Sequence, residues 1–454
     1  MKRRLSLLLG LLLAVISASC GSRATPVDSA QDKAEAVSAP TSRPVTPSRF
    51  SPDSLPPICN CVLRFDRIGI EQGLSQSSVN VSFQDSRGFL WFGTQDGLNR
   101  YDGHIFKTYK PDPDVPYSLS DRWITAIVED KQGYLWVATR LGGLNRYDPR
   151  TENFTHFLHN DGNPASLSDN HVNVLYLDKD DNLWVGTTKG LDLFDRARNT
   201  FEHYGSSQKE GSAGKNITAI FQDHRGRFWV GMTTRGLNRF YPRNHMFVAY
   251  PNNPNNPNSI SYSHVTAIAE DKNGVLWVGT RSGLNRFEPD TIRFDRFLHS
   301  ESDATSIADN MINALYVDST GNLWVGTAGG LDRLSTRGGG FVHYRNDPTY
   351  SISLSYDSVI SIHEDRGGVL WFGTYGGGVN KYDRQRDNFS YYRNNVKDPN
   401  TLSGSFITPI YVDREGYAWI GTSGAGLNRF NWATNQVTRY RHNPNDPNSI
   451  GSDV

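Results

Sequence analysis

Apolar and polar residues alternate in short runs that are separated by tight turns, and one stretch shows the whole pattern. Residues 265–271 (VTAIAED) alternate and are rich in β-branched side chains, so they predict a strand. Residues 271–274 (DKNG) predict a turn, because Asp accepts backbone N–H bonds and Gly adopts positive φ. Residues 276–280, 284–287 and 294–297 predict three more strands. The stretch therefore predicts a unit of four antiparallel strands.

This unit recurs along the chain at spacings of 45 to 48 residues. A period of this length with four strands per unit is typical of a β-propeller. The sequence predicts an all-β fold: a β-propeller of four-stranded antiparallel blades, with eight complete repeats in residues 62–442. Residues 443–454 predict the start of an incomplete ninth repeat. One tryptophan marks each complete repeat: Trp91, Trp136, Trp184, Trp229, Trp277, Trp324, Trp371 and Trp419.

The number of blades in the ring is left open by the repeat count. Residues 63–68 (LRFDRI) precede the first inner strand and match the outer strand at 294–297. We expect this leading strand to pair with a later blade, which would close the ring and remove an exposed edge. A seven-bladed ring with one surplus repeat and an eight-bladed ring are both compatible with the sequence.

Each repeat also keeps an aspartate at the first turn and, with one exception, the glycine of a Gly-Thr pair in the second strand. The aspartate is preceded by an acid at Glu129, Glu270 and Glu364. A catalytic carboxylate pair occurs once in a protein, whereas these residues recur in every unit, so we interpret them as structural. We expect the tryptophan to pack on the neighbouring blade, and the glycine to allow close approach of two sheets. The turn aspartates are Asp85, Asp130, Asp178, Asp223, Asp271, Asp318, Asp365 and Asp413.

The N-terminus is typical of an export signal. Basic residues 2–4 precede an apolar run at 5–16, and small residues lead to Cys20. The sequence predicts a signal peptide at 1–19 and a flexible tether rich in Ser, Pro and Ala at 20–61. The pattern resembles a bacterial lipoprotein signal, which implies lipidation of Cys20; simple cleavage or an uncleaved anchor is the alternative.

Composition and charge exclude some partners. The formal net charge is zero, with 47 basic and 47 acidic residues, which argues against a nucleic-acid groove. Cys59 and Cys61 supply too few ligands for a metal site, and we interpret them as two thiols at a domain edge, with a disulfide between them as the alternative. We therefore expect no cofactor, no bound metal and no nucleic acid.

Three segments of the first repeat carry a family resemblance: 73–79 (GLSQSSV), 84–94 (QDSRGFLWFGT) and 96–103 (DGLNRYDG). They resemble the two-component regulator propeller repeat, and the resemblance extends over about residues 62–454. It implies the extracytoplasmic sensor region of a hybrid two-component sensor histidine kinase, in the periplasm or at the cell surface, with a homodimer as a further expectation. Better-known members of the family sense oligosaccharides from polysaccharide breakdown.

The chain departs from the usual plan of that family. It carries no kinase segment, so kinase activity would belong to an implied longer parent. Residues 444–454 repeat the motif of 254–265, and Val454 corresponds to the first residue of a ninth inner strand. We therefore expect the chain to be the front part of a longer sensor, or a product truncated relative to it.

Residues that differ between the repeats are the candidates for function. The residue before each inner strand is expected near one end of the central channel, where aromatic, imidazole and amide groups suit a sugar. The loop aromatics Tyr117, Tyr262, Tyr350 and Tyr356 could add to such a site. The candidate ligand-binding residues are Trp123, His171, Asn216, His264, Met311 and Phe406, and Ser78 and Ser358 hold the same position in the two other repeats.

The sequence thus predicts a sensing propeller that binds a glycan or another small ligand and has no catalysis of its own. One alternative is a lipid-anchored propeller that binds a glycan or a protein without signalling. Another is a propeller lyase, for which His171, His264 and then His363 would be the first candidates. No carboxylate stands at metal-ligand spacing from these histidines, which disfavours the lyase.

Overall fold

The computed structural model describes residues 63–205, 216–335, 339–385, 392, 394, 398–432, 434 and 436–454. The predicted signal peptide and tether, with Cys20, Cys59 and Cys61, lie outside these residues. Within them, no helix is long and apolar enough to span a bilayer.

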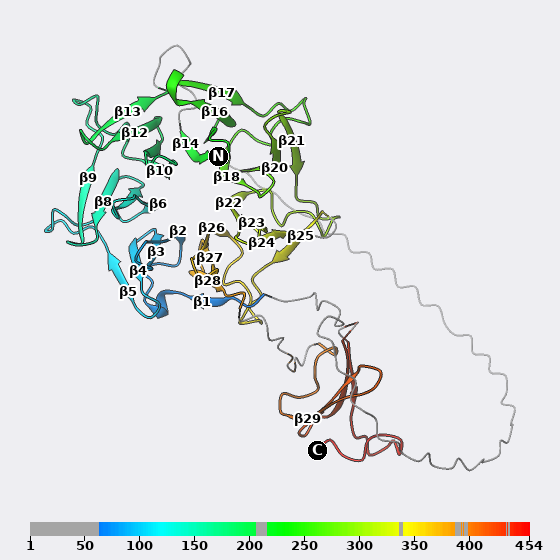
Figure 1. Cartoon of the computed structure of the whole chain (residues 1–454). Coiled ribbons are helices and arrows are strands. Elements are labelled where there is room, and N and C mark those ends of the chain that lie inside the picture. The colour runs from blue at the N-terminus through cyan, green and yellow to red at the C-terminus, as the bar shows by residue number, and fades with distance from the viewer. Residues whose placement is uncertain are drawn as a thin grey trace, which may run out of the picture. The chain divides into compact units, whose positions relative to one another are not determined.

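The described chain folds into eight antiparallel sheets of four strands each (Figure 1). In seven of them, four strands that follow one another in sequence pair in order; the remaining sheet has the order β1-β28-β27-β26. Two short 3₁₀ helices, η2 (Ile70–Gln72) and η3 (Pro242–Asn244), lie in connecting loops. The strands are β1 Asp66–Ile68, β2 Val79–Gln84, β3 Leu90–Thr94, β4 Gly97–Tyr101, β5 Phe106–Tyr109, β6 Ile124–Glu129, β7 Leu135–Thr139, β8 Leu144–Asp148, β9 Asn153–Phe157, β10 Val172–Leu177, β11 Leu183–Thr187, β12 Leu191–Asp195, β13 Thr200–Tyr204, β14 Ile217–Gln222, β15 Phe228–Met232, β16 Leu237–Tyr241, β17 Met246–Tyr250, β18 Val265–Glu270, β19 Leu276–Thr280, β20 Gly283–Glu288, β21 Arg293–Phe297, β22 Ile312–Val317, β23 Leu323–Thr327, β24 Leu331–Leu334, β25 Phe341–Tyr344, β26 Val359–Glu364, β27 Leu370–Thr374, β28 Val379–Tyr382, β29 Ile407–Val412, β30 Ala418–Thr422, β31 Gly426–Asn431 and β32 Gln436–Tyr440.

Seven of the sheets form the blades of one closed ring. Their inner strands contact one another in the cyclic order β2, β6, β10, β14, β18, β22 and β26, and β26 contacts β2 in turn. The cycle leaves no position for an eighth blade. The ring is therefore seven-bladed, and the eighth repeat is the surplus one.

The N-terminal strand β1 closes this ring, as the sequence predicts. It pairs antiparallel with β28 in the seventh blade, with Asp66 opposite Lys381 and Ile68 opposite Val379 (Figure 1). Phe65, just before the strand, is buried among the rings of Tyr344, Phe372 and Tyr382. The seventh blade thus takes its outer strand from the start of the chain, which joins two segments about 300 residues apart.

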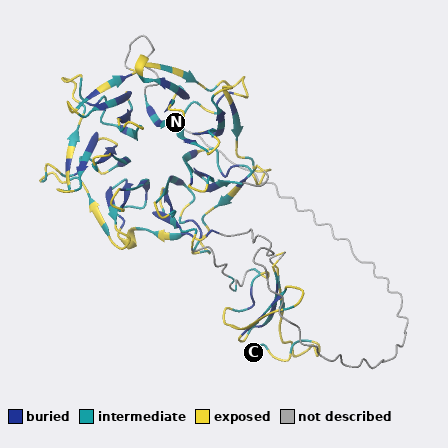
Figure 2. Ribbon diagram, in the orientation of Figure 1, coloured by how far each residue is buried: buried dark blue, intermediate teal, exposed yellow. Residues whose placement is uncertain are grey.

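Packing between blades uses the repeated tryptophan and glycine as expected. Trp91 of the first blade is fully buried in a cluster with Ile124 and Leu135 of the second. A Cβ added to Gly93 would lie 2.6 Å from the Ile124 side chain, so a larger residue there would push the two blades apart. Figure 2 shows buried positions along the strands of each blade, and exposed ones in the loops and along the outermost strands.

The turn aspartate has a second role that the sequence analysis missed. In all eight repeats its Oδ2 accepts the indole N–H of the tryptophan six residues later, at 2.7–3.1 Å. In the fourth blade, Oδ1 of Asp223 also accepts the backbone N–H groups of Arg225 and Arg227. Burial raises the pKa of Asp223, but the bonds from Trp229 and Arg227 outweigh it and hold this pKa below its usual value. The aspartate fixes the turn and the tryptophan together.

A belt of hydrogen bonds along the channel links the inner strands. The second residue of an inner strand donates to the carbonyl that begins the next one, as Asn80 Nδ2 does to Ile124 O (2.8 Å). At the closing seam, where this position is apolar, the next residue takes over: Ser361 Oγ donates to Val79 O at 3.0 Å. The same kind of bond is made by Thr125, Asn173, Thr218 and Asn313.

A second belt joins the turns at the other end of the inner strands. Where the residue after the turn aspartate is Ser or His, it donates to the glutamate that precedes the turn of the next blade. Ser86 donates its N–H and Oγ–H to Glu129, at 2.6 and 2.7 Å. His224 with Glu270 and Ser319 with Glu364 repeat this arrangement. The three acids that could suggest catalysis are therefore used between blades.

Where the residue after the turn aspartate is Lys or Arg, no glutamate follows in the next blade. The basic side chain instead reaches carbonyl oxygens of the next turn: Lys179 Nζ donates to Asp223 O at 3.2 Å, and Arg366 Nη2 to Asp85 O at 2.9 Å. Lys131 and Lys272 act in the same way at their seams. All seven seams of the ring thus carry one of these two contacts.

The eighth sheet, β29 to β32, has its own small core and an exposed inner strand. Leu402, Ala418, Ile420 and Phe430 are buried together, and Tyr392 packs on the ring of Phe430 at 4.8 Å. Every residue of β29 is exposed, whereas the first residue of each inner strand in the ring is buried. The sheet therefore holds its strands together without the facing blade that covers the other inner strands.

We predict that Phe65→Ala lowers the free energy of unfolding by about 3–5 kcal/mol, because the truncation leaves a cavity under the closing strand. Urea unfolding followed by tryptophan fluorescence measures this change. The control is Arg64→Ala, whose side chain is 59% exposed and should cost under about 0.5 kcal/mol. Equal losses in the two variants would contradict closure of the ring through Phe65.

His363 gives a pH-dependent prediction at the same seam. It lies in β26 at the position where Tyr176 and Tyr316 stand in other blades, and its Nε2 is buried without a partner among the described residues. Burial lowers the pKa of His363 to about 4. Below pH 6.5 the unfolded chain takes up a proton that the folded chain excludes, so stability falls by up to about 3 kcal/mol as the pH approaches 4.

We therefore expect His363→Tyr to raise the melting temperature at pH 5 more than at pH 8. The tyrosine hydroxyl would also accept the N–H of Gln84, as Tyr176 accepts that of Gln222 at 3.1 Å. Thermal unfolding at both pH values tests this, with the exposed His104→Tyr as control. An equal shift of the melting temperature at both pH values would show that the buried imidazole does not titrate as proposed.

Candidate functional site

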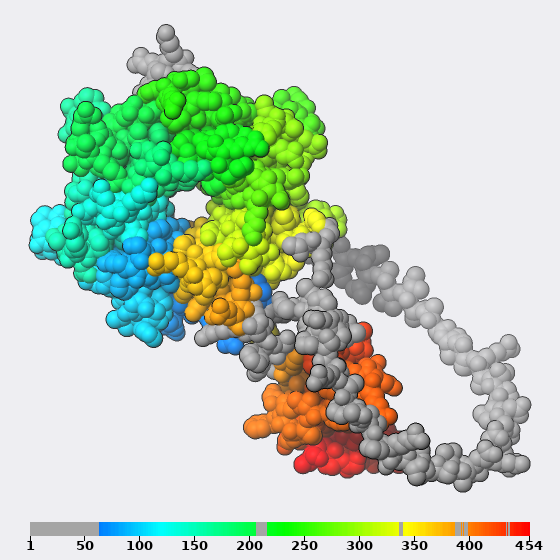
Figure 3. All heavy atoms as spheres, viewed as in Figure 1, coloured from blue at the N-terminus to red at the C-terminus, as the bar shows by residue number. Residues whose placement is uncertain are grey.

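The variable residues form two tiers at one end of the channel, which we call the channel mouth. The first tier is the residue before each inner strand, and the second is the residue after the Gly-Thr pair or its variant in the same blade. Backbone bonds join the tiers: Arg140 N donates to Trp123 O (3.0 Å) and Arg281 N to His264 O (3.1 Å). Figure 3 shows the ring pierced by an opening at its centre.

Five of the six predicted binding residues take part in this mouth. Trp123, His171, Asn216, His264 and Met311 precede β6, β10, β14, β18 and β22, which contact one another around the ring. Whether they bind a ligand stays a prediction.

Phe406 corrects the prediction, because it precedes β29 and belongs to the eighth sheet. Its side chain is 82% exposed, and β29 is not one of the seven inner strands that form the ring. The seventh blade, which contains β26 and β1, completes the ring. The ring therefore does not include β29, the strand that Phe406 precedes.

The side chains at the mouth differ in how much of their surface is free. The guanidinium of Arg140 lies 4.3 Å from the ring centroid of Trp123 and covers one face of the indole. The amide oxygen of Asn216 accepts a bond from Asn173 at 2.8 Å, so that amide is oriented by the neighbouring blade. Met311 is 38% exposed. The mouth therefore offers a cation on an aromatic ring, an oriented amide and an apolar side chain.

Both histidines at the mouth are held neutral. Burial, and then the charge of Arg281, lower the pKa of His264 to about 4. Burial and the charge of Arg140 lower the pKa of His171 in the same way, against a smaller opposite effect of Asp169. Near neutral pH each ring can therefore donate one hydrogen bond and accept another.

The second tier was missed by the sequence analysis, although its signal was present. The position after Gly-Thr is as variable as the first tier, and aligning the repeats at that position would have found it. Tyr375 is 54% exposed there, and Tyr356 from the preceding loop packs over Gly376 beside it. The second-tier residues are Gln95, Arg140, Thr188, Thr233, Arg281, Ala328 and Tyr375.

The four loop tyrosines do not gather at one place. Tyr262 and Tyr356 stand two residues before His264 and Ser358, next to the mouth. The carbonyl of Tyr117, in contrast, accepts the N–H of Phe154 in β9, the outermost strand of its blade. Tyr117 therefore lies at the rim of the ring. Tyr350 lies near the outermost strand of the seventh blade, where its carbonyl accepts a bond from Arg67 in β1.

The three histidines of the lyase alternative are not brought together. His363 is the fifth residue of β26, whereas His171 and His264 belong to the mouth. Within the part of the chain that the structure describes, no three His, Cys, Asp or Glu side chains are grouped so as to hold a metal ion.

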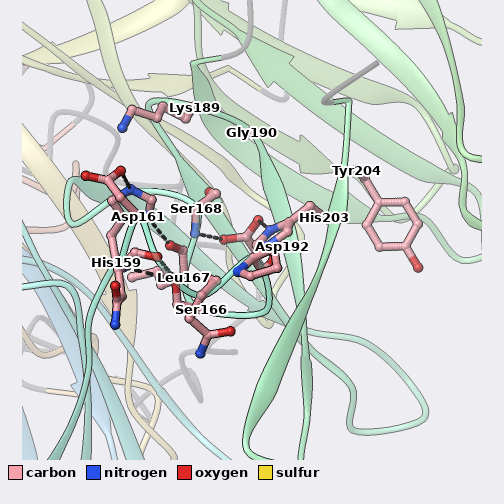
Figure 4. A pocket seen from close by; sticks show the side chains of 13 residues that line it. His159, Asp161, Ser166, Leu167, Ser168, Lys189, Gly190, Asp192, His203 and Tyr204 are labelled. Carbon is pink, nitrogen blue, oxygen red and sulfur yellow. Dashed lines mark hydrogen bonds and ion pairs between the residues drawn. The ribbon is translucent and has the colours of Figure 1, made fainter. Parts of the chain in front are cut away.

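A cavity of about 310 Å³ lies in the third blade, between the loop that leads to β10 and the end of β13 (Figure 4). At its base, the buried Asp192 accepts a bond from His203 Nδ1 at 2.7 Å and one from Ser168 N at 2.9 Å. His203 Nε2 contacts Pro164 O at 2.9 Å. Because these polar groups bond to one another, we interpret the cavity floor as structural.

The Asp192–His203 pair replaces an asparagine that six other repeats keep. In the fifth blade, Asn285 accepts the N–H of Ser261 and donates to the hydroxyl of the same serine. Both ends of the Asn285 amide are therefore hydrogen-bonded within the blade. A carboxylate cannot donate, and a histidine on the adjacent strand supplies the missing proton. Asp332 with His343 in the sixth blade repeats the exchange at 2.6 Å.

Asp192→Asn should destabilise the ring more at pH 5.5 than at pH 9. The bond to Asp192 raises the pKa of His203, against the effect of burial, so the pair stabilises the fold below pH 6.5 and loses this effect as the pH rises through the raised value. Urea unfolding at the two pH values measures the difference. Asp161→Asn in the same cavity, where the carboxylate is fully exposed, is the control. A pH-independent loss would rule out a protonated His203.

Comparison with known proteins agrees with this architecture. Eight segments match the two-component regulator propeller family: residues 73–96, 118–140, 166–189, 211–234, 259–282, 306–329, 353–376 and 401–424. The chain carries this repeat in every blade and in the eighth sheet, and it belongs to the two-component regulator propeller family.

Two relatives show where such propellers occur. Histidine kinase P4 of Formosa agariphila is 37% identical over 215 residues, which cover 46% of this chain and 15% of that protein. The extracellular domain of a hybrid two-component system protein from B. thetaiotaomicron is 27% identical in a superposition with a TM-score of 0.70, which covers 83% of this chain and 49% of that one. The chain thus spans less than half of the length of either relative.

A third comparison shows the fold alone. The virginiamycin B lyase of Staphylococcus aureus is 12% identical in a superposition with a TM-score of 0.52, which covers 70% of this chain and 98% of the lyase. At this identity the likeness carries no argument about activity.

Proposed function

We propose that the ring is the ligand-sensing part of a two-component receptor and that it binds a carbohydrate at the channel mouth without converting it. The receptor would hold the propeller on the extracytoplasmic side of a bacterial membrane, anchored through its N-terminus, and would signal as a homodimer. The relatives support the setting, because one is a histidine kinase and the other an extracellular domain of a hybrid two-component system.

The observation that carries the proposal is the separation of roles among the residues. The shared Asp, Trp and Gly are used within and between blades, and the acids before the turns bind the neighbouring turns. The residues that vary meet at the mouth, where Tyr375, Tyr262 and Tyr356 are about half exposed. Exposed aromatic faces stack on the apolar faces of sugar rings, and neutral imidazole and amide groups bond to hydroxyl groups.

Isothermal titration calorimetry of the mature chain with a panel of bacterial, plant and algal oligosaccharides tests this function. We expect one class to bind, and Tyr375→Ala to weaken that binding about tenfold through loss of one stacked ring. Tyr117→Ala, an equally exposed tyrosine at the rim, is the matched control and should leave the affinity unchanged.

The proposal fails in two ways that the experiment separates. Chromatography of the oligosaccharide after the titration should recover it intact; a cleaved product would indicate an enzyme instead. Equal weakening by Tyr375→Ala and Tyr117→Ala would place the binding site away from the channel mouth.

A further inference from the structure

The charged residues in the two tiers of the channel mouth are all basic. Each of the seven blades contributes one residue to each tier, and none of these residues is Asp or Glu. Two are arginines, Arg140 and Arg281, although the chain as a whole has as many acidic as basic residues. The mouth therefore has an excess of positive charge that the composition of the protein does not explain.

Carboxylates do occur in the loops next to the mouth, but they bind backbone N–H groups or basic side chains other than the two arginines. Asp96, which follows Gln95, contacts Lys110 at 2.5 Å. Asp121 accepts the N–H of Leu141 at 2.9 Å, and Asp309 that of Met311 at 2.7 Å. Asp169 accepts the N–H of His171 at 2.7 Å and contacts Lys189 at 3.3 Å. Each of these acids is thus used in shaping its own loop.

The two arginines form no ion pair with any carboxylate in the part of the chain that the structure describes. The planar Arg140 guanidinium lies over Trp123, which orients it and leaves its N–H groups free for a ligand. Arg281 follows Thr280 in the tight turn after β19 and is exposed. A guanidinium presents N–H donors in a fork that matches the oxygens of a carboxylate or sulfate group.

The charge of these arginines acts across the mouth. After burial, Arg281 is what lowers the pKa of His264, and Arg140 lowers that of His171. Arg281 and His264 belong to the fifth blade, and Arg140 and His171 to the adjacent second and third blades, so each arginine acts on the histidine beside it.

We infer that the mouth selects an anionic carbohydrate, a glycan with carboxylate or sulfate groups, and that Arg140 and Arg281 bind those groups. This inference rests on the proposed function and adds the ligand's charge to it. Exposed tyrosines would stack on the sugar rings, while the guanidinium groups bond to the acidic substituents. A neutral glycan would leave both cations without partners in a partly desolvated site, at a cost in affinity.

The test compares three sets of oligosaccharides of equal length with the mature chain: oligouronates, sulfated galactans and unsulfated galactans. We expect at least one anionic set to bind, with an affinity that falls as salt is added. Arg140→Gln and Arg281→Gln should each weaken this binding about tenfold, since hydrogen bonds to charged groups are among the stronger ones. The set that binds identifies carboxylate or sulfate as the group.

Arg293→Gln is the control, because Arg293 is also exposed but lies in the outermost strand β21 beside Asp295, away from the mouth. Circular dichroism and urea unfolding confirm that each variant is folded. Binding of the unsulfated galactan with no anionic set bound would overturn the inference and leave the proposed function intact. Binding that is insensitive to both mouth arginines would also overturn it. If no carbohydrate binds, the inference and the proposed function both fail.

Discussion

The fold depends on one local interaction, the bond between the turn aspartate and the tryptophan indole six residues later. It occurs in all eight repeats, and the same carboxylate also accepts N–H groups of its own turn. One aspartate side chain therefore fixes the conformation of the turn and the position of the tryptophan. The tryptophan lies near the start of the second strand and packs on the next blade. Because the indole N–H is satisfied within the blade, the tryptophan can be buried by its neighbour without an unpaired donor.

Neighbouring blades are joined by polar contacts that use only a few residues at each seam. The belt along the channel uses one hydroxyl or amide at six of the seven seams, whereas Thr266 Oγ1 at the remaining seam has no partner among the described residues. The belt that joins the turns uses either a carboxylate from the following blade or a basic side chain from the preceding one. The choice is consistent around the ring: a glutamate precedes the next turn only where Ser or His, as in Ser86 and His224, stands after the aspartate. Each of the seven seams thus contains one of these two polar contacts between turns.

These structural duties leave few residues for binding. The acids that recur are committed to turns and seams, and the buried Asp192 and Asp332 are paired with histidines. The two tiers of the channel mouth vary between repeats, and backbone bonds such as those from Arg140 N to Trp123 O and from Arg281 N to His264 O fix the position of their residues. The residues of the two tiers can therefore differ from blade to blade without a change in the blades themselves.

The strands, turns and repeat period followed from the sequence, because they rest on local alternation and on turn residues at fixed offsets. The expected strands at 265–271 and 276–280 match β18 and β19 within a residue, and the pairing of the leading strand was predicted from its likeness to an outer strand. The structural role of Glu129, Glu270 and Glu364 was also inferred from their recurrence. All of these features depend on residues close in sequence or repeated along it.

Only the tertiary structure decided the number of blades and the membership of the site. The twist and contact of seven inner strands bring β26 back to β2, which fixes the ring at seven and leaves Phe406 outside it. The same closure buries His363 at the seam rather than at the mouth. The stacking of Arg140 on Trp123 joins residues 17 positions apart that no periodicity links. Such contacts arise from the closure of the ring, and eight similar repeats carry no local signal of where it closes.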